Sequence, residues 1–155
     1  MTYVLGILLF GGLIWYFGIY AERKKTKKVR KQLLSGEKSY IVHWTYDKDF
    51  DFAEFQASDN GLRLFKKKLS NVKEVYICND GILLGEDLYF SWKKYAKFNE
   101  LVITMDDPPC IFFHIEYQVG ESKNIVKFSI PIPPERELEA VSVLDHLVGT
   151  VRYEY

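Results

Sequence analysis

The sequence of 155 residues predicts an α+β protein. We expect an N-terminal transmembrane helix, then an antiparallel curled sheet or partly closed barrel, then a C-terminal amphipathic helix. Three observations predict this class. Residues 3–20 contain no charged side chain, residues 73–132 form short strand-like runs separated by turns, and residues 135–148 carry apolar side chains at helical spacing.

The first element, residues 1–21, has the composition of a membrane span. A helix over residues 3–20 would extend about 27 Å, close to the ~30 Å thickness of a hydrocarbon core. Trp15, Tyr16 and Tyr20 are expected at the membrane–water interface, where aromatic side chains are enriched. A cleaved signal peptide is the alternative. The run has no positive residue before it and ends in bulky side chains, which favours a retained anchor.

A basic segment and linker, residues 22–38, follows the apolar run. Its basic side chains are Arg23, Lys24, Lys25, Lys27, Lys28, Arg30 and Lys31. Because no basic residue precedes the apolar run, the positive-inside rule predicts an inner-membrane protein with its N-terminus outside and its soluble domain in the cytoplasm. The same residues are candidates for contact with anionic lipid headgroups. Residues 24–34 could continue as helix, and Ser35-Gly36-Glu37 would then break it.

Charge is distributed unevenly although the chain is neutral overall. Residues 1–31 carry a net charge of +6 and residues 32–155 a net charge of −6. An acidic domain is a poor general ligand for nucleic acid, because neutralising phosphates requires an excess of Lys and Arg. We therefore expect no nucleic-acid partner.

The soluble domain, predicted over residues 39–149, begins with an alternating strand at residues 40–46 that places Trp44 on one face and His43 on the other. We expect helix over much of residues 48–69, broken around Asp59-Asn60-Gly61. Asn79-Asp80-Gly81 then predicts a hairpin between strands at 73–78 and 82–84, since Gly allows a positive φ in the turn. Further strands are expected at 88–92, 101–105, 110–119 and 125–132.

The last predicted element is an amphipathic helix from residue 135 to 148. Its expected apolar stripe would cover the open end of the curled sheet, and Gly149 would cap it. Residues 150–155 would form a tail. The expected stripe consists of Leu138, Val141, Leu144, Leu147 and Val148.

This order of elements resembles bacterial membrane proteins with a pleckstrin-homology-like (PH-like) domain. The resemblance rests on Trp44-Thr45-Tyr46, on Asp80-Gly81-Ile82 leading to Tyr89-Phe90-Ser91-Trp92, and on Ile130-Pro131-Ile132-Pro133-Pro134-Glu135. It covers roughly residues 39–149. It implies a curled sheet closed by the C-terminal helix, and it does not by itself imply a function.

The sequence predicts no catalytic set, metal site or cofactor. Cys110, His114 and Glu116 lie at alternate positions of one predicted strand, so a metal site there is conceivable. Alternating polar residues more often mark the outer face of a sheet. We therefore interpret these residues as surface positions and expect a protein that is not an enzyme.

The predicted function is a membrane-anchored cytoplasmic interaction module that binds a protein partner. The alternatives are an accessory subunit of a membrane complex and an enzyme with a pocket beneath the C-terminal helix. The sequence leaves the oligomeric state open.

Overall fold

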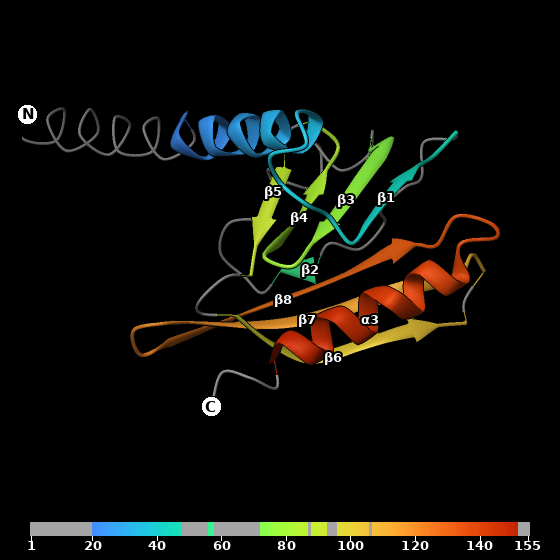
Figure 1. The fold of residues 1–155 in the computed structure, drawn as a ribbon. Helices are drawn as coiled ribbons and strands as arrows, with labels where there is room; N and C mark the ends of the chain where they lie inside the picture. The colour runs from blue at the N-terminus through green and yellow to red at the C-terminus, as the bar shows by residue number, and fades with distance from the viewer. Residues whose placement is uncertain are drawn as a thin grey trace, which may run out of the picture.

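The computed structural model describes residues 20–47, 56–57, 72–86, 88–92, 96–105 and 107–151 (Figure 1). These residues form two four-stranded antiparallel sheets and two helices. Sheet A has the strand order β1-β3-β4-β5, and sheet B has the order β2-β8-β7-β6. One helix covers residues 20–34 and is called the N-terminal helix below. The other is α3, Glu137–Val151.

Sheet A is covered on both faces. Its strands are β1 (Val42–Thr45), β3 (Glu74–Cys78), β4 (Gly81–Leu84) and β5 (Leu88–Ser91). Val75, Ile77 and Ile82 face the main core, whereas Cys78 and Leu83 join a separate cluster with residues of the N-terminal helix. Because neither face meets water, β3 and β4 are almost continuously apolar rather than alternating.

Gly81 closes the hairpin between β3 and β4 for a reason that differs from the predicted one. Cys78 pairs with Gly81, so the hairpin prediction is confirmed. Gly81 does not have a positive φ. A Cβ at this position would instead lie 2.5 Å from the Tyr89 hydroxyl oxygen and 2.7 Å from the Phe90 carbonyl oxygen. The neighbouring strand therefore approaches the backbone too closely for any side chain.

Sheet B alternates between a core face and an outer face. Its strands are β2 (Gln56–Ala57), β6 (Ala96–Thr104), β7 (Cys110–Val119) and β8 (Ser122–Pro131). In β7, Ile111, Phe113 and Ile115 are fully buried. The Phe113 ring stacks on Phe128 of β8 with centroids 4.7 Å apart. This period of two is the pattern expected for a sheet with one face on the core.

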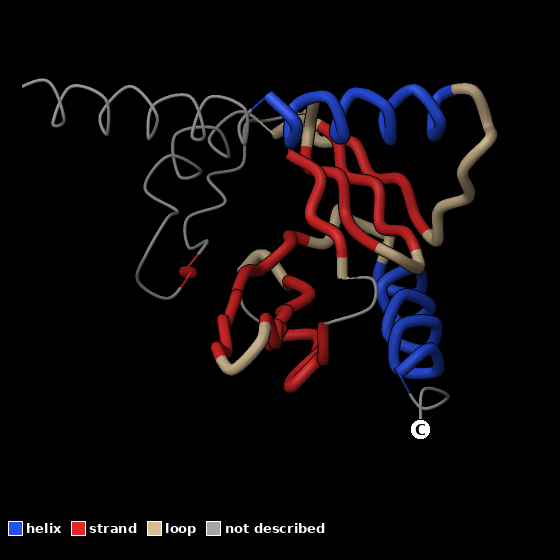
Figure 2. The backbone as a smooth tube through the Cα atoms, turned by 90° about the vertical axis from the view of Figure 1, so that its left-hand side faces the viewer, coloured by secondary structure: helices blue, strands red, loops and turns tan. Residues whose placement is uncertain are grey.

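The two helices lie on different sides of the sheets (Figure 2). The N-terminal helix crosses the outer face of sheet A, where Val29 and Leu33 are buried. α3 closes the main core with Ala140, Val143 and Leu147, which have no exposed area. The indole Nε1 of Trp44, on β1, donates a hydrogen bond to Glu139 Oε2 at 2.8 Å and so ties α3 to sheet A.

The predicted apolar stripe of α3 is mostly wrong. Leu147 is buried and Leu144 is partly buried, but Leu138, Val141 and Val148 are exposed. The helix carries apolar residues on more than one face. It is oriented so that Ala140 and Val143 face the core, and in this orientation Glu139 accepts the hydrogen bond from Trp44. The predicted C-cap is wrong as well, because α3 continues through Gly149 to Val151.

The prediction of a transmembrane helix is corrected by the structure. Neither helix in the described ranges is long and apolar enough to cross a bilayer, so the single-pass topology and the inner-membrane location are not supported. The predicted span, residues 3–20, lies outside the described residues except for Tyr20. The N-terminal helix is highly charged, and its buried apolar residues pack on sheet A.

The helix predicted over residues 48–69 lies outside the described residues except at Gln56–Ala57. At these two residues the prediction is wrong, because they form β2. They pair antiparallel with Lys127 and Val126 of β8. Such a pairing joins residues about seventy positions apart, which local spacing does not reveal.

Candidate functional site: the basic face of the N-terminal helix

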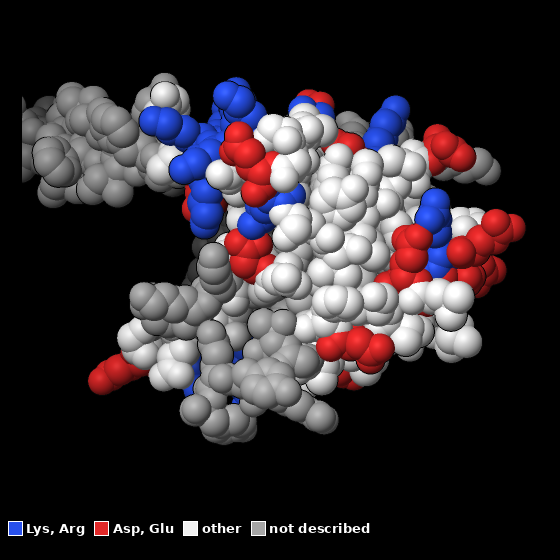
Figure 3. All heavy atoms as spheres, viewed as in Figure 1, with Lys and Arg blue, Asp and Glu red and all other residues white. Residues whose placement is uncertain are grey.

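The N-terminal helix turns a set of basic side chains toward solvent (Figure 3). Within the described residues, none of this set takes part in an ion pair. We call the set the basic face; it consists of Arg23, Lys24, Lys27, Lys28 and Lys31, all exposed. Five like charges on neighbouring helical turns repel one another, so this face favours an anionic partner.

The other two predicted basic residues are engaged with sheet A. Arg30 Nη2 lies 3.3 Å from Glu74 Oε1 and 2.9 Å from Glu86 Oε1. Lys25 Nζ lies 5.9 Å from the centre of the Tyr89 ring, within the range of a cation–π contact. The structure therefore separates the seven residues into two that contact side chains of sheet A or the turn after β4 and five without such a contact among the described residues.

The buried side of the helix fixes the orientation of the helix on sheet A and therefore which side chains face solvent. Thr26, Val29 and Leu33 are buried at i, i+3 and i+7 spacing, which places them on one side of the helix. The Tyr89 backbone N–H donates to Thr26 Oγ1 at 3.3 Å, so an N–H of β5 is satisfied by the helix. The helix thus contacts sheet A through a narrow seam, which consists of Thr26, Val29 and Leu33. The basic face lies on the solvent side of the helix.

The segment after the helix holds its C-terminal end. Lys38 Nζ lies 2.6 Å and 2.7 Å from the two carboxylate oxygens of Asp80, in the β3–β4 turn. Lys38 N–H also donates to the Gln32 carbonyl at 3.0 Å, and Gly36 takes a positive φ of 76° in the turn between them. The helix ends at residue 34, so the predicted break at Ser35-Gly36-Glu37 is confirmed. The contacts of Lys38 also hold the linker against sheet A.

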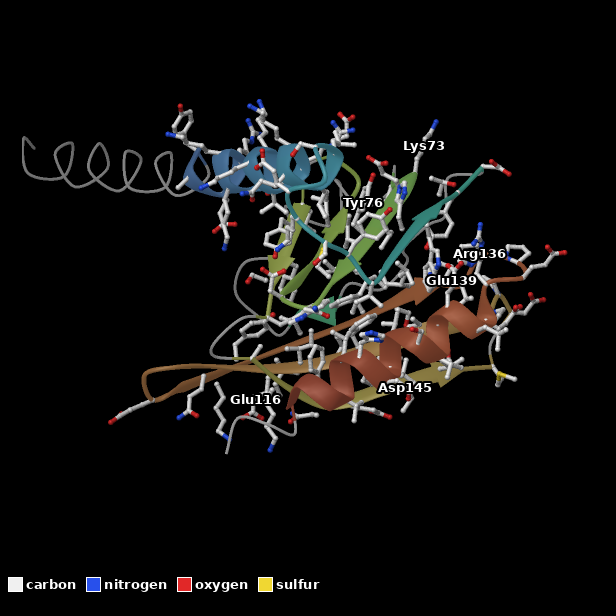
Figure 4. All side chains as sticks on the ribbon, in the orientation of Figure 1. Lys73, Tyr76, Glu116, Arg136, Glu139 and Asp145 are labelled. Carbon is white, nitrogen blue, oxygen red and sulfur yellow. The ribbon has the colours of Figure 1, made fainter. Side chains whose placement is uncertain are left out.

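An aromatic cluster lies on the outer face of sheet A (Figure 4). His43 and Tyr76 are partners in the β1–β3 register, and their rings stack with centroids 3.9 Å apart. Tyr40 meets Tyr76 edge-on at 5.4 Å. His43 Nε2 lies 3.5 Å from Glu74 Oε2, so the same carboxylate faces both His43 and Arg30. Burial, followed by the charge of Glu74, raises the pKa of Tyr76.

Sequence reasoning missed this cluster and the docking of the helix. The alternation of β1 placed His43 opposite Trp44, but the partner across the sheet is set by register, which the sequence does not state. A signal for the docking was present in the spacing of Thr26, Val29 and Leu33. The charges around these residues obscured it.

The remaining predicted site residues are not brought together. Trp15 and Tyr16 lie outside the described residues, and Tyr20 is exposed. The Cys110 thiol donates to the Pro108 carbonyl, His114 Nδ1 lies 4.0 Å from Glu100, and Glu116 pairs with Lys123 at 3.0 Å. Lys123 lowers the pKa of Glu116 through this hydrogen bond. In the part of the chain that the structure describes, no group of three His, Cys, Asp or Glu side chains could hold a metal ion.

The space beneath α3 is occupied by side chains of the main core. Ala140, Val143 and Leu147 have no exposed area there, and Trp44 is almost completely buried. The Tyr46 hydroxyl donates to the Pro131 carbonyl at 2.8 Å, and burial raises the pKa of Tyr46. The described groups that meet at this place are therefore packed or hydrogen-bonded to one another.

Comparison of the chain with protein-family models, with curated proteins and with solved structures finds no match. The resemblance to PH-like domains stays a prediction.

Proposed function

We propose that this chain is a protein-interaction module that binds an acidic surface of a partner protein through the basic face of its N-terminal helix. The main support is that the basic face projects from a helix docked on sheet A and forms no ion pair within the described residues. The basic face consists of Arg23, Lys24, Lys27, Lys28 and Lys31. The positive charge is therefore available to a partner.

Docking of the helix lowers the cost of binding. An unstructured basic segment would lose backbone freedom when it bound, and each residue fixed in this way costs about 1–2 kcal/mol. Here the seam at Thr26, Val29 and Leu33 and the contacts of Lys38 have already ordered the helix. Charge complementarity on such a surface mainly raises the rate and specificity of association.

The acidic character of the rest of the chain supports a protein partner over nucleic acid. Residues 32–155 carry a net charge of −6. A phosphate backbone that followed the helix onto the neighbouring surface would meet this negative charge. A partner protein with a compact acidic patch would contact the helix alone.

The test compares the full chain with a variant in which Lys24, Lys27, Lys28 and Lys31 are changed to Gln, which keeps helix propensity. A photo-crosslinking side chain at position 20, next to the basic face, captures the partner in cells. The purified partner is then titrated against both chains. At about 0.5 kcal/mol for each surface charge, the four changes should weaken binding about 30-fold. The wild-type affinity should also fall as salt is added.

The control changes Lys97 and Lys123 to Gln on sheet B, which removes two exposed positive charges far from the helix in sequence, one of them paired with Glu116. This control should bind as the wild type does. Equal capture by the wild type and the four-lysine variant would refute the proposal. Binding of both chains to mixed phosphatidylcholine–phosphatidylserine vesicles, with no protein captured, would assign the basic face to anionic lipid instead.

A further inference from the structure

The outward side of α3 carries apolar side chains that the fold leaves uncovered. Leu138 is 86% exposed, Val141 46% and Val148 40%. Together with Asp145 they follow i, i+3, i+7 and i+10 spacing, so they lie on one side of the helix, opposite Ala140, Val143 and Leu147. We call Leu138, Val141, Asp145 and Val148 the outer stripe.

Another exposed apolar residue lies just after the last residue of β6. Met105, 90% exposed, follows the end of β6, where Thr104 pairs with Cys110. The segment leading into α3 passes this end, because Ile132 N–H donates to the Pro109 carbonyl. Met105 and Leu138 have the largest exposed fractions among the exposed hydrophobic residues of the described chain. The two most exposed apolar side chains of the described residues thus belong to α3 and to the end of β6.

The outer stripe lies among acidic side chains. Asp145 is part of it, and Glu135 and Glu137 are exposed at the start of α3. The one nearby arginine, Arg136, is paired with Glu139, as Figure 4 shows at the start of the helix. No ion pair is made by Glu135, Glu137 or Asp145 within the described ranges. A ligand of this surface must therefore supply positive charge beside an apolar strip.

We infer that the outer stripe of α3 binds an amphipathic helix of a partner protein that carries lysine or arginine on either side of an apolar strip. A helical ligand presents its apolar anchors along one side, so it can lie lengthwise against the outer stripe. The apolar anchors would bury Leu138 and Val141, and the basic side chains would meet Asp145 and Glu137. This surface is distinct from the basic face and of opposite charge, so the inference goes beyond the proposed function.

The charges of this chain argue against a second copy as the occupant. Two α3 helices facing each other would bring Asp145, Glu137 and Glu135 of both copies together. The N-terminal helix of a second copy offers positive charge, but it turns Val29 and Leu33 inward onto its own sheet A. It would leave the apolar part of the outer stripe without a matching strip.

The experiment titrates the full chain with two synthetic amphipathic helical peptides. Both carry leucine at i, i+3, i+7 and i+10; one has lysine beside the leucines and the other has glutamate. The four-lysine variant defined above, which lacks most of the basic face, should bind the lysine peptide and not the glutamate peptide. Leu138→Ser with Val141→Ser should weaken binding of the lysine peptide at least tenfold, because truncating a central apolar anchor commonly has an effect of this size. Asp145→Lys should weaken it and strengthen binding of the glutamate peptide.

Leu34→Ser is the matched control, since Leu34 is an exposed leucine at the end of the other helix. All the changed side chains are exposed, so the variants should melt like the wild type. Equal binding of the lysine peptide to the wild type and to the Leu138–Val141 variant would overturn the inference. So would equal binding of the two peptides to the four-lysine variant, in which the basic face no longer attracts the glutamate peptide. A wild-type dimer in sedimentation that Leu138→Ser dissociates would also overturn it and identify the occupant as a second copy.

Discussion

The two helices of the described chain contact the sheets in different ways. α3 places three fully buried residues, Ala140, Val143 and Leu147, in the main core. The N-terminal helix adds Val29 and Leu33 to a smaller cluster on the other face of sheet A and relies on polar contacts for the rest. α3 is part of the core that joins the two sheets, whereas the N-terminal helix is a cover over one of them.

This difference has a consequence for stability. Losing α3 would expose the main core, so α3 should unfold only together with the sheets. The N-terminal helix buries less apolar surface, and its ion pairs are partly exposed and individually weak. It should open locally at a free energy below that of global unfolding. The N-terminal helix, which carries the basic face, can therefore detach from sheet A while the rest of the described fold stays intact.

The largest expected effect is at Leu147. Changing Leu147 to Ala leaves a cavity in the main core and should lower the free energy of unfolding by about 3 kcal/mol. Denaturant titration followed by circular dichroism measures this loss, and the transition should stay cooperative. Val148→Ala, one residue further on the exposed side, should change stability by less than about 0.5 kcal/mol. Equal losses for the two variants would contradict the assignment of faces on α3.

The next effect is at Gly81, in the sheet that the N-terminal helix covers. A Cβ there would lie 2.5 Å from the Tyr89 hydroxyl oxygen and 2.6 Å from Cζ. Gly81→Ala should therefore cost about 1–3 kcal/mol through overpacking. Adding Tyr89→Phe should not rescue it, because the Phe90 carbonyl oxygen remains 2.7 Å away. Recovery of wild-type stability in the double variant would show that the hydroxyl alone is the obstacle.

Parts of this fold could be predicted because they depend on local patterns. The β3–β4 hairpin follows from a turn sequence between two apolar runs, and the core face of β7 follows from alternation at Ile111, Phe113 and Ile115. The rotation of α3 could not be predicted in this way. Its sequence offers apolar residues on two sides, and tertiary contacts such as the bond from Trp44 to Glu139 distinguish them.

The candidate site shows the same limit. The seven basic residues were identified from composition, but composition cannot divide them into Arg30 and Lys25, which contact sheet A, and five that face outward. That division depends on Glu74, Glu86 and Tyr89, which lie more than forty residues away. The uncharged run at residues 3–20 favours a membrane span and the basic residues after it favour an orientation, whereas the spacing of Thr26, Val29 and Leu33 indicates a buried side.

A smaller effect is expected where the cover meets sheet A. Leu33→Ala should cost about 2 kcal/mol, and the loss should appear as local opening. Cys78 reports this opening, because it is buried under the helix and burial raises its pKa to about 11. In a Cys110→Ser background, alkylation of Cys78 at mildly alkaline pH should accelerate about 30-fold in the Leu33 variant. Leu34→Ala is the control. If the labelling rate does not change, the helix opens only with the whole domain.

The smallest effect is expected at Glu139, on the helix that belongs to the core. The hydrogen bond from Trp44, followed by the contact with Arg136, lowers the pKa of Glu139. A lowered carboxyl pKa contributes stability that is complete above the unfolded pKa of about 4.3 and is lost as pH falls through the folded pKa. Glu139→Gln keeps an acceptor for Trp44 but removes the charge, so it should cost about 0.5–1 kcal/mol at neutral pH.

Melting curves between about pH 6 and pH 3 test this linkage. The difference between the wild type and Glu139→Gln should shrink as the wild-type carboxylate becomes protonated. Glu137→Gln removes an exposed carboxylate from the same helix and should not change the slope of melting temperature against pH at the acid end. A constant difference between the wild type and Glu139→Gln across this range would mean that the Trp44 bond does not depend on the charge of Glu139. In that case α3 would be held by its apolar contacts, and the two helices would differ only in how much apolar surface they bury.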